Sequence, residues 1–230
     1  ISDEEQIALD KDATYWENNA SINSRLKAIA LATHHTYLFL EFIPNHLYGW
    51  LNKQLSINES AAINALRLVE SQMQETNYFM GSQNFLHMDA HFENILTDGE
   101  QLYYSDFGLA LSQKFQLSSV EEDFFRDNAS YDRASGIVNL LHCLITYMNK
   151  SQLLQKTKIV QGIRGYGSTF KSDLNQFKEI LGHYADRNIS SNTPLLDQII
   201  QNYAPVAVKM DEFYCSIQDD KSTKYPDESM

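Results

Sequence analysis

Two aspartates and an asparagine near the middle of the chain have the types and the spacing of a site that acts on a phosphate. Asp89 and Asn94 lie five residues apart in one short loop, and Asp106 follows twelve residues after Asn94. Mg²⁺ bound to a polyphosphate needs only one or two protein oxygen ligands besides water and phosphate oxygens, and Asn94 and Asp106 would supply them. Asp89 would orient an attacking hydroxyl and accept its proton. These residues therefore predict phosphoryl transfer.

A β-hairpin is expected between Asn94 and Asp106. Two short apolar or aromatic runs, 94–97 and 101–104, flank Asp98-Gly99, which is a strong hairpin signal. Because a hairpin folds back on itself, it would return Asp106 to the neighbourhood of Asn94. The spacing predicts one site rather than two.

The same stretch resembles the protein-kinase signature set, in which H-R-D-L-x-x-x-N precedes D-F-G. Here His87, Asp89 and Asn94 precede Asp106-Phe107-Gly108 in that order. The resemblance implies that Asp89 is the catalytic aspartate, that Asn94 and Asp106 bind the metal, and that His87 supports the loop. It also implies ATP and Mg²⁺ as cofactors.

His91 indicates which branch of the superfamily the chain is closest to. Protein kinases that phosphorylate Ser or Thr usually have Lys at this position, whereas H-x-D-x-H-x-x-N resembles the aminoglycoside phosphotransferase and choline kinase branch. Met88 stands where a small Gly is often found. His91 is expected to support the loop, and members of this branch modify small molecules.

The first 43 residues are interpreted as the remnant of a small lobe, made of one helix and two strands. The helix is expected from Ser2 to about Asn18, and the strands over 26–32 and 36–43. Neither a Gly-rich phosphate loop nor a V-A-I-K lysine strand precedes them. The chain is therefore expected to be an incomplete view of a longer polypeptide.

The second expected strand runs into a hinge at Pro44 and would form part of a nucleotide pocket. Backbone groups around Glu41 to Ile43 would meet the adenine edge, and Leu40 would close the rear of the pocket. Leu96 would press on the other face of the base, giving a mostly apolar slot with a few polar groups.

Residues 44–230 are interpreted as a large helical lobe. Helices are expected from 47 to 55, from 58 to about 78, and over 152–161, 171–184 and 195–210. Gly165 and Gly167 have the spacing of a phosphate loop, but they follow D-F-G and are better explained as caps or turns. Residues 218–230 are expected to form a frayed tail.

The segment after D-F-G is short and contains no A-P-E, so it favours a small-molecule acceptor over a peptide. A new helix is expected from Tyr131, and by the resemblance Asp132 at its start would brace the catalytic loop. Four acidic residues in the short segment form either a solvated helix face or the entry for an amine-bearing acceptor: Glu121, Glu122, Asp123 and Asp127.

Composition narrows the possible partners and compartment. The 230 residues carry a formal charge of −12, which disfavours nucleic acid, and the longest apolar run, 137–148, is too short to cross a membrane. Two isolated cysteines favour neither a disulfide framework nor a metal site and fit a reducing cytoplasm.

The sequence thus predicts an α+β, protein-kinase-like fold and an ATP- and Mg²⁺-dependent enzyme that phosphorylates a hydroxyl of a small molecule, with cationic acceptors considered first. Two alternatives stay open. One is an atypical Ser/Thr protein kinase. The other is a non-catalytic pseudokinase or binding module.

Overall fold

A computed structural model describes residues 3–15, 20–34, 36–150, 170–185, 193–220 and 222–226. Its contacts divide the chain into two compact units, residues 1–42 (unit 1) and residues 43–230 (unit 2). The sequence had placed this boundary one residue later. That the units correspond to the two lobes of a kinase stays a prediction.

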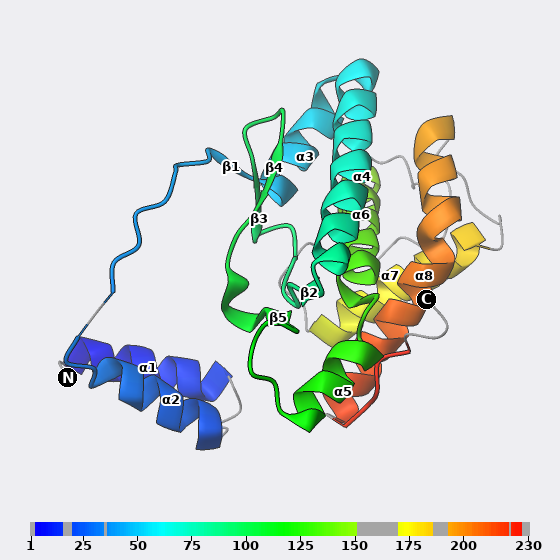
Figure 1. Ribbon diagram of the computed structural model, residues 1–230. Helices are drawn as coiled ribbons and strands as arrows, with labels where there is room; N and C mark the ends of the chain where they lie inside the picture. Colours follow the sequence, from blue (N-terminus) through cyan, green and yellow to red (C-terminus); the bar gives the residue numbers. More distant parts are fainter. Residues whose placement is uncertain are drawn as a thin grey trace. The chain divides into compact units, whose positions relative to one another are not determined.

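Unit 1 contains two helices that contact each other, α1 (Asp3–Tyr15) and α2 (Ala20–Ala30) (Figure 1). The first predicted helix is confirmed over residues 3–15, and its expected end at 16–18 lies outside the described residues. The strand predicted over 26–32 is wrong, because residues 26–30 belong to α2. Apolar residues recur there at helical intervals, at Ile22, Leu26 and Ile29, and their neighbours Ala, Arg and Lys favour helix.

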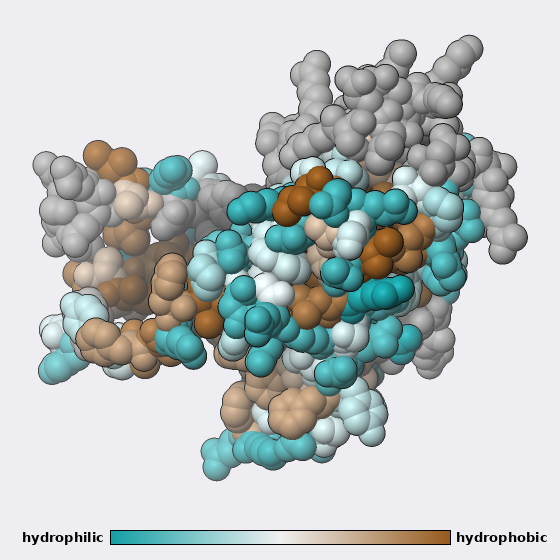
Figure 2. All heavy atoms as spheres, turned by 90° about the horizontal axis from the view of Figure 1, so that it is seen from above, coloured by the Kyte–Doolittle hydropathy of each residue, from teal (hydrophilic) through white to brown (hydrophobic). Residues whose placement is uncertain are grey.

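The strand predicted over 36–43 is also wrong. Residues 36–44 form no regular secondary structure, and no described residue pairs with them as a neighbouring strand. A strand needs such a partner for its backbone N–H and C=O groups. The side chains of Leu38, Phe39 and Phe42 are 78, 97 and 83% exposed, and Figure 2 shows brown, apolar surface on unit 1 at the left of the view.

Unit 2 is rich in helix. Its described helices are α3 (Leu47–Ile57), α4 (Glu59–Ser82), α5 (Ser119–Asp127), α6 (Tyr131–Lys150), α7 (Phe170–Ala185) and α8 (Pro194–Asp219). The predicted helices over 47–55, 58–78, 171–184 and 195–210 are confirmed, as is the helix that starts at Tyr131. The helix predicted over 152–161 and the turn at Gly165 and Gly167 lie outside the described residues.

Two short antiparallel sheets lie beside these helices. One joins β1 (Asn45–His46), β3 (Ile95–Thr97) and β4 (Leu102–Tyr104), and the other joins β2 (Phe85–Leu86) and β5 (Leu111–Ser112). The predicted hairpin is confirmed as β3–β4, in which Ile95 faces Tyr104 and Thr97 faces Leu102. The combination of helices and short sheets agrees with the predicted α+β class.

The core of unit 2 lies between α3, α4, α6, α7 and α8. Apolar residues of α4 repeat at helical intervals and are buried, including Leu66, Val69 and Met73. They face α6, on which Leu141 and Leu144 are fully buried, and α8 packs against both α6 and α7. This core fixes the start of α6 relative to the end of α4, and the loop with Asp89 lies next to both.

The end of unit 2 differs from the prediction of a frayed tail. α8 continues to Asp219, and Tyr225 is buried, with its ring 5.5 Å from those of Tyr131 and Phe213. The Tyr225 hydroxyl lies 2.9 Å from Ser130 Oγ. One aromatic side chain thus anchors a segment that is otherwise polar.

No helix among the described residues is long and apolar enough to cross a membrane.

Candidate active site

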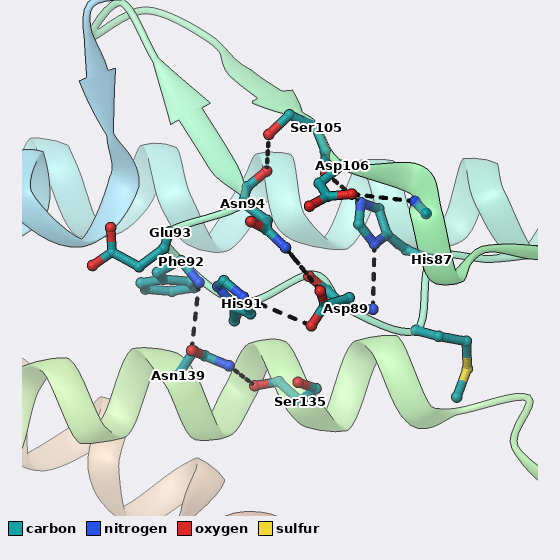
Figure 3. A network of polar contacts seen from close by, with 12 residues as sticks. His87, Asp89, His91, Phe92, Glu93, Asn94, Ser105, Asp106, Ser135 and Asn139 are labelled. Carbon is teal, nitrogen blue, oxygen red and sulfur yellow. Dashed lines mark hydrogen bonds and ion pairs between the residues drawn. The ribbon is translucent and has the colours of Figure 1, made fainter. Parts of the chain in front are cut away.

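The hairpin brings Asp106 to Asn94 through two hydrogen bonds at its open end. The backbone N–H and the hydroxyl of Ser105 both donate to the Asn94 carbonyl oxygen, at 2.9 and 2.7 Å. Since Ser105 directly precedes Asp106, these bonds hold Asp106 beside Asn94 (Figure 3). The structure therefore brings these two predicted site residues together.

The closed end of the hairpin is organised by Asp98. Its Oδ1 accepts hydrogen bonds from the backbone N–H groups of Glu100 and Gln101, at 2.8 and 2.9 Å, and its Oδ2 accepts one from the Tyr103 hydroxyl. These donors favour the ionised carboxyl and lower the pKa of Asp98 below its ordinary value, the Glu100 N–H most of all. Gly99 has a φ of 98°, a conformation that favours glycine. The predicted turn is confirmed.

Asn94 also contacts Asp89. Its Nδ2 donates to both the backbone oxygen and the Oδ2 of Asp89, each at 3.0 Å. Because the amide nitrogen is used in this way, the amide oxygen of Asn94 is left as an acceptor for another group. His91 Nε2 lies 3.7 Å from the other carboxylate oxygen of Asp89. Figure 3 shows this loop between the hairpin and α6.

His87 links the two halves of the site from within the protein. Its ring is completely buried, and its Nδ1 accepts a hydrogen bond from the Asp89 backbone N–H at 3.3 Å. This bond requires the proton on Nε2, which lies 2.9 Å from the Ser105 carbonyl oxygen and donates to it. One imidazole thus ties the residue before Asp106 to the loop that carries Asp89. The supporting role predicted for His87 agrees with these contacts.

Asp132, at the start of α6, clamps the backbone of the same loop. Its Oδ2 accepts from the His87 N–H at 2.6 Å, and its Oδ1 accepts from the Met88 N–H at 2.8 Å. Burial raises the pKa of Asp132 above its ordinary value, although the two N–H donors oppose the shift. These two contacts are the ones expected of the predicted brace.

Two residues of the site adopt left-handed backbone conformations. Met88 has a φ of 66° and Asp106 a φ of 55°. Such conformations are uncommon for residues other than glycine and cost free energy, and they persist where surrounding contacts hold them. At Met88 the holding contact is Asp132. At Asp106 the carboxylate Oδ1 accepts a 3.3 Å hydrogen bond from the Gly108 N–H.

The oxygen atoms at this site fit a hard divalent cation. Asn94 Oδ1 and Asp106 Oδ2 accept no hydrogen bond from the described residues, and Asp106 is exposed. Among the residues that the structure describes, no three His, Cys, Asp or Glu side chains gather as metal ligands. A cation here would therefore depend on Asn94 and Asp106 together with water and phosphate oxygens, as Mg²⁺ does.

The residues predicted to contact adenine are distributed over both units. Leu40 and Glu41 belong to unit 1 and are exposed, whereas Ile43 and Leu96 belong to unit 2 and are half-buried. Leu96 lies on β3 opposite Tyr103 and His46. Their joint contact with a nucleotide stays a prediction.

A large cavity lies next to the loop of Asp89. Its volume is about 1080 Å³, and its walls include Met88, which precedes Asp89, and Tyr131. Burial raises the pKa of Tyr131, and the nearby carboxylates of Asp132 and, to a smaller extent, Asp89 add to the shift, while a hydrogen bond with Tyr214 opposes it. We call this space the acceptor cavity, after the role that we propose for it below.

The sequence did not predict most of the acceptor cavity. Phe213 and Tyr214 of α8 line it together with Tyr225. Only Asp123 and Asp127 of the four acidic residues line it, and both pair with Arg126, at 2.7 and 3.8 Å. Glu121 instead closes a capping box with Ser118.

A further supporting residue is Asn139 of α6. Its Oδ1 accepts from the Phe92 N–H at 3.4 Å, while its Nδ2 donates to the Ser135 carbonyl at 2.8 Å. The sequence carried a signal for it, because Asn139 interrupts an otherwise apolar helix. A polar residue in such a place needs a partner, and here the partner is the loop that follows His91.

Comparison with protein family models, with curated proteins and with solved structures found no match.

Proposed function

We propose that this protein is an ATP- and Mg²⁺-dependent phosphotransferase that phosphorylates a hydroxyl of a small molecule. The observation that carries the proposal is the pair of hydrogen bonds from Ser105 to the backbone carbonyl oxygen of Asn94, at 2.9 and 2.7 Å. They place Asp106 beside Asn94 while the Asn94 amide is bound to Asp89. Asn94 thus has Asp106 beside it along the hairpin and contacts the Asp89 carboxylate through its own side chain.

The three side chains would have different roles. Asn94 Oδ1 and Asp106 would hold Mg²⁺, which would neutralise the charge of the transferred phosphoryl group. Asp89 would orient the acceptor hydroxyl and receive its proton. The contact with Asn94 Nδ2 keeps one carboxylate oxygen of Asp89 in place, and the other faces His91.

The order of elements supports a protein-kinase-like fold for unit 2. A long helix leads into the loop of Asp89, a hairpin leads out of it to Asp106, and the following α6 returns Asp132 to clamp that loop. By the resemblance stated above, this is the arrangement of the large lobe. Assignment of unit 1 to a small lobe belongs to the same proposal.

The acceptor cavity supports a small molecule as substrate. Residues 110–130, between D-F-G and α6, form β5, a short loop and the nine-residue α5, which leaves little chain for a peptide platform. Among the residues that the structure describes, the charged ones that line the cavity are Asp123, Asp127, Arg126 and Lys224, and the formal charges of these four cancel. A preference for a cationic acceptor would therefore come from the aromatic lining and from Asp89.

A non-catalytic nucleotide-binding module is the second candidate, and unit 1 favours it. The described residues of unit 1 are two helices and a segment without regular structure, so they contain no sheet that could cover a nucleotide. Such a module would bind Mg-ATP or another ligand without transferring phosphate. It would use Asn94 and Asp106, and Asp89 would be dispensable.

Incubation with γ-labelled ATP and Mg²⁺ tests the proposal. The acceptor panel would contain choline, ethanolamine, an aminoglycoside and a mixed protein substrate. The labelled phosphate is expected in a small hydroxyl compound. The Asp89→Asn variant is expected to transfer it about 10²–10⁴-fold more slowly while it still binds Mg-ATP. Asp98→Asn, at the far end of the same hairpin, is the matched control and should retain activity.

Three other results would change the conclusion. Label in protein alone would favour the atypical protein kinase. Binding of Mg-ATP without any labelled product would favour the non-catalytic module. Equal loss of nucleotide binding in Asp89→Asn and Asp106→Asn would contradict the separate roles given to these residues.

A further inference from the structure

A second cavity lies in unit 2 between α4, α6 and α8, and none of the described residues lines both it and the acceptor cavity. Its volume is about 790 Å³, within the usual range of small-molecule sites. None of Asp89, Asn94 and Asp106 lines it. The function proposed above therefore assigns no role to this cavity.

The floor of the second cavity is apolar. Met73 of α4 and Leu140 of α6 are buried, and Ile137 of α6 is half-buried. An apolar floor of this kind holds the hydrocarbon part of a ligand, and a few polar groups around it fix the orientation.

Arg133 is the cation in the wall of the second cavity. It is exposed, and it makes no hydrogen bond or ion pair with another residue that the structure describes. It follows Asp132, whose two carboxylate oxygens accept hydrogen bonds from the backbone N–H groups of His87 and Met88. A guanidinium group in a cavity is well suited to bind a carboxylate through two hydrogen bonds.

The side-chain oxygen of Asn77 is a hydrogen-bond acceptor to which no described residue donates. This oxygen, Oδ1, is buried and has no hydrogen-bond partner among the residues that the structure describes. A buried acceptor of this kind costs free energy unless a donor reaches it. Since Asn77 lines the second cavity, rotation of its side chain would bring this oxygen to an N–H group of a ligand, which would satisfy it.

The two glutamates of the second cavity are not equivalent. The Tyr203 hydroxyl donates to Glu70, and burial together with Glu70 raises the pKa of Tyr203 to about 12, so the phenol keeps its proton. The charge of Glu70 therefore already has a partner. Glu75 is exposed and has no such partner among the described residues, so it is available for a positive group.

From these groups we infer that the second cavity binds a zwitterionic small molecule of the amino-acid type. Its carboxylate would meet Arg133, its ammonium group would donate to Asn77 Oδ1 near Glu75, and its apolar side chain would lie on Met73, Ile137 and Leu140. The inference does not depend on the phosphotransferase proposal, because it uses none of the same residues.

Calorimetry with L-phenylalanine tests the inference. Two probes lack one charge each: 3-phenylpropanoate has no ammonium group, and 2-phenylethylamine has no carboxylate. L-Phenylalanine is expected to bind saturably with a Kd of about 1 mM or tighter, and each single-charge probe at least about tenfold more weakly.

Variants locate the binding. Arg133→Ala and Asn77→Leu are each expected to weaken the binding of L-phenylalanine by roughly tenfold or more. Arg67→Ala, which removes an exposed arginine of α4 outside the second cavity, is the matched control and should bind as the wild type does. Asn77→Leu also removes the unsatisfied oxygen, so its melting temperature should not fall, which separates lost binding from lost folding.

The inference is overturned if L-phenylalanine does not bind saturably, if it binds no more tightly than the single-charge probes, or if Arg133→Ala and Asn77→Leu retain wild-type affinity. Asp89→Asn should leave this binding unchanged. Failure of the phosphotransferase proposal and failure of the second site would therefore be seen in different experiments.

Discussion

Asp132→Ala should destabilise unit 2 because it removes the clamp on the loop that carries Asp89. The carboxylate accepts two backbone N–H groups, at 2.6 and 2.8 Å, and Asp132 is only 5% exposed. A buried donor left without an acceptor costs about 1–3 kcal/mol, so two such donors would cost about 2–6 kcal/mol. Because the loop can relax and admit water, the lower half of this range is expected, about 3 kcal/mol.

Urea unfolding would measure the loss as a lower midpoint with an unchanged slope. For a unit of this size a loss of 1 kcal/mol lowers the melting temperature by about 2–4 °C, so about 6–12 °C is expected for Asp132→Ala. Asp132→Asn keeps one acceptor but turns an NH₂ group towards a donor, and it should lose about half as much.

Asp123→Ala is the control, because it removes an aspartate that pairs with Arg126 on the surface. The Asp123 side chain is 64% exposed, and pairs of this kind contribute about 1 kcal/mol or less. Amide exchange at Met88 locates the effect, since its N–H should lose protection in Asp132→Ala and keep it in Asp123→Ala. A stability of Asp132→Ala within about 0.5 kcal/mol of the wild type, or unchanged protection at Met88, would refute the clamp.

Two other predictions concern the backbone around the site. Met88→Gly should raise the free energy of unfolding by about 0.5–1 kcal/mol, because Met88 has a φ of 66° and glycine adopts this conformation without strain. Met88→Ala keeps the strain and should not raise the free energy of unfolding. A lower free energy of unfolding in Met88→Gly would contradict this prediction. Asp98 should titrate below 3.8 in a carboxyl NMR experiment, because backbone N–H groups hold its ionised form. Its contribution to stability should be present above that pH and disappear as the pH falls through the lowered pKa, and a midpoint at or above 3.8 would show that these bonds do not form in solution.

The hairpin and the clamp could be predicted because their signals are local or follow the family pattern. Asp98-Gly99 defines the turn through its own hydrogen bonds, and the regular apolar spacing in α4 specifies a helix whatever packs against it. Asp132 was found through the resemblance, and the structure confirms its contacts with His87 and Met88.

The wrong predictions concern segments whose structure depends on contacts with residues distant in the sequence. The aromatic run 37–42 has strand propensity, but a strand forms only with a partner, and the sequence gives no sign of one. Residues 26–30 alternate poorly and fit a helical repeat better. Tyr225 lies in a polar tail, and its burial depends on Tyr131 and Phe213, which are distant in sequence. The aromatic wall of the acceptor cavity was missed for the same reason.

The central claim is that Asn94 and Asp106 together bind one divalent cation, which is also bound by the phosphates of a nucleotide. Replacing Mg²⁺ with Mn²⁺ tests this claim most directly. In the presence of ATP, Mn²⁺ should broaden the NMR signals of Asn94 and Asp106 strongly and those of Asp98 and Gly99, at the other end of the hairpin, much less. Asp106→Asn should reduce this broadening. Equal broadening along the whole hairpin, or none at Asn94 and Asp106 when ATP and Mn²⁺ are both present, would contradict the account.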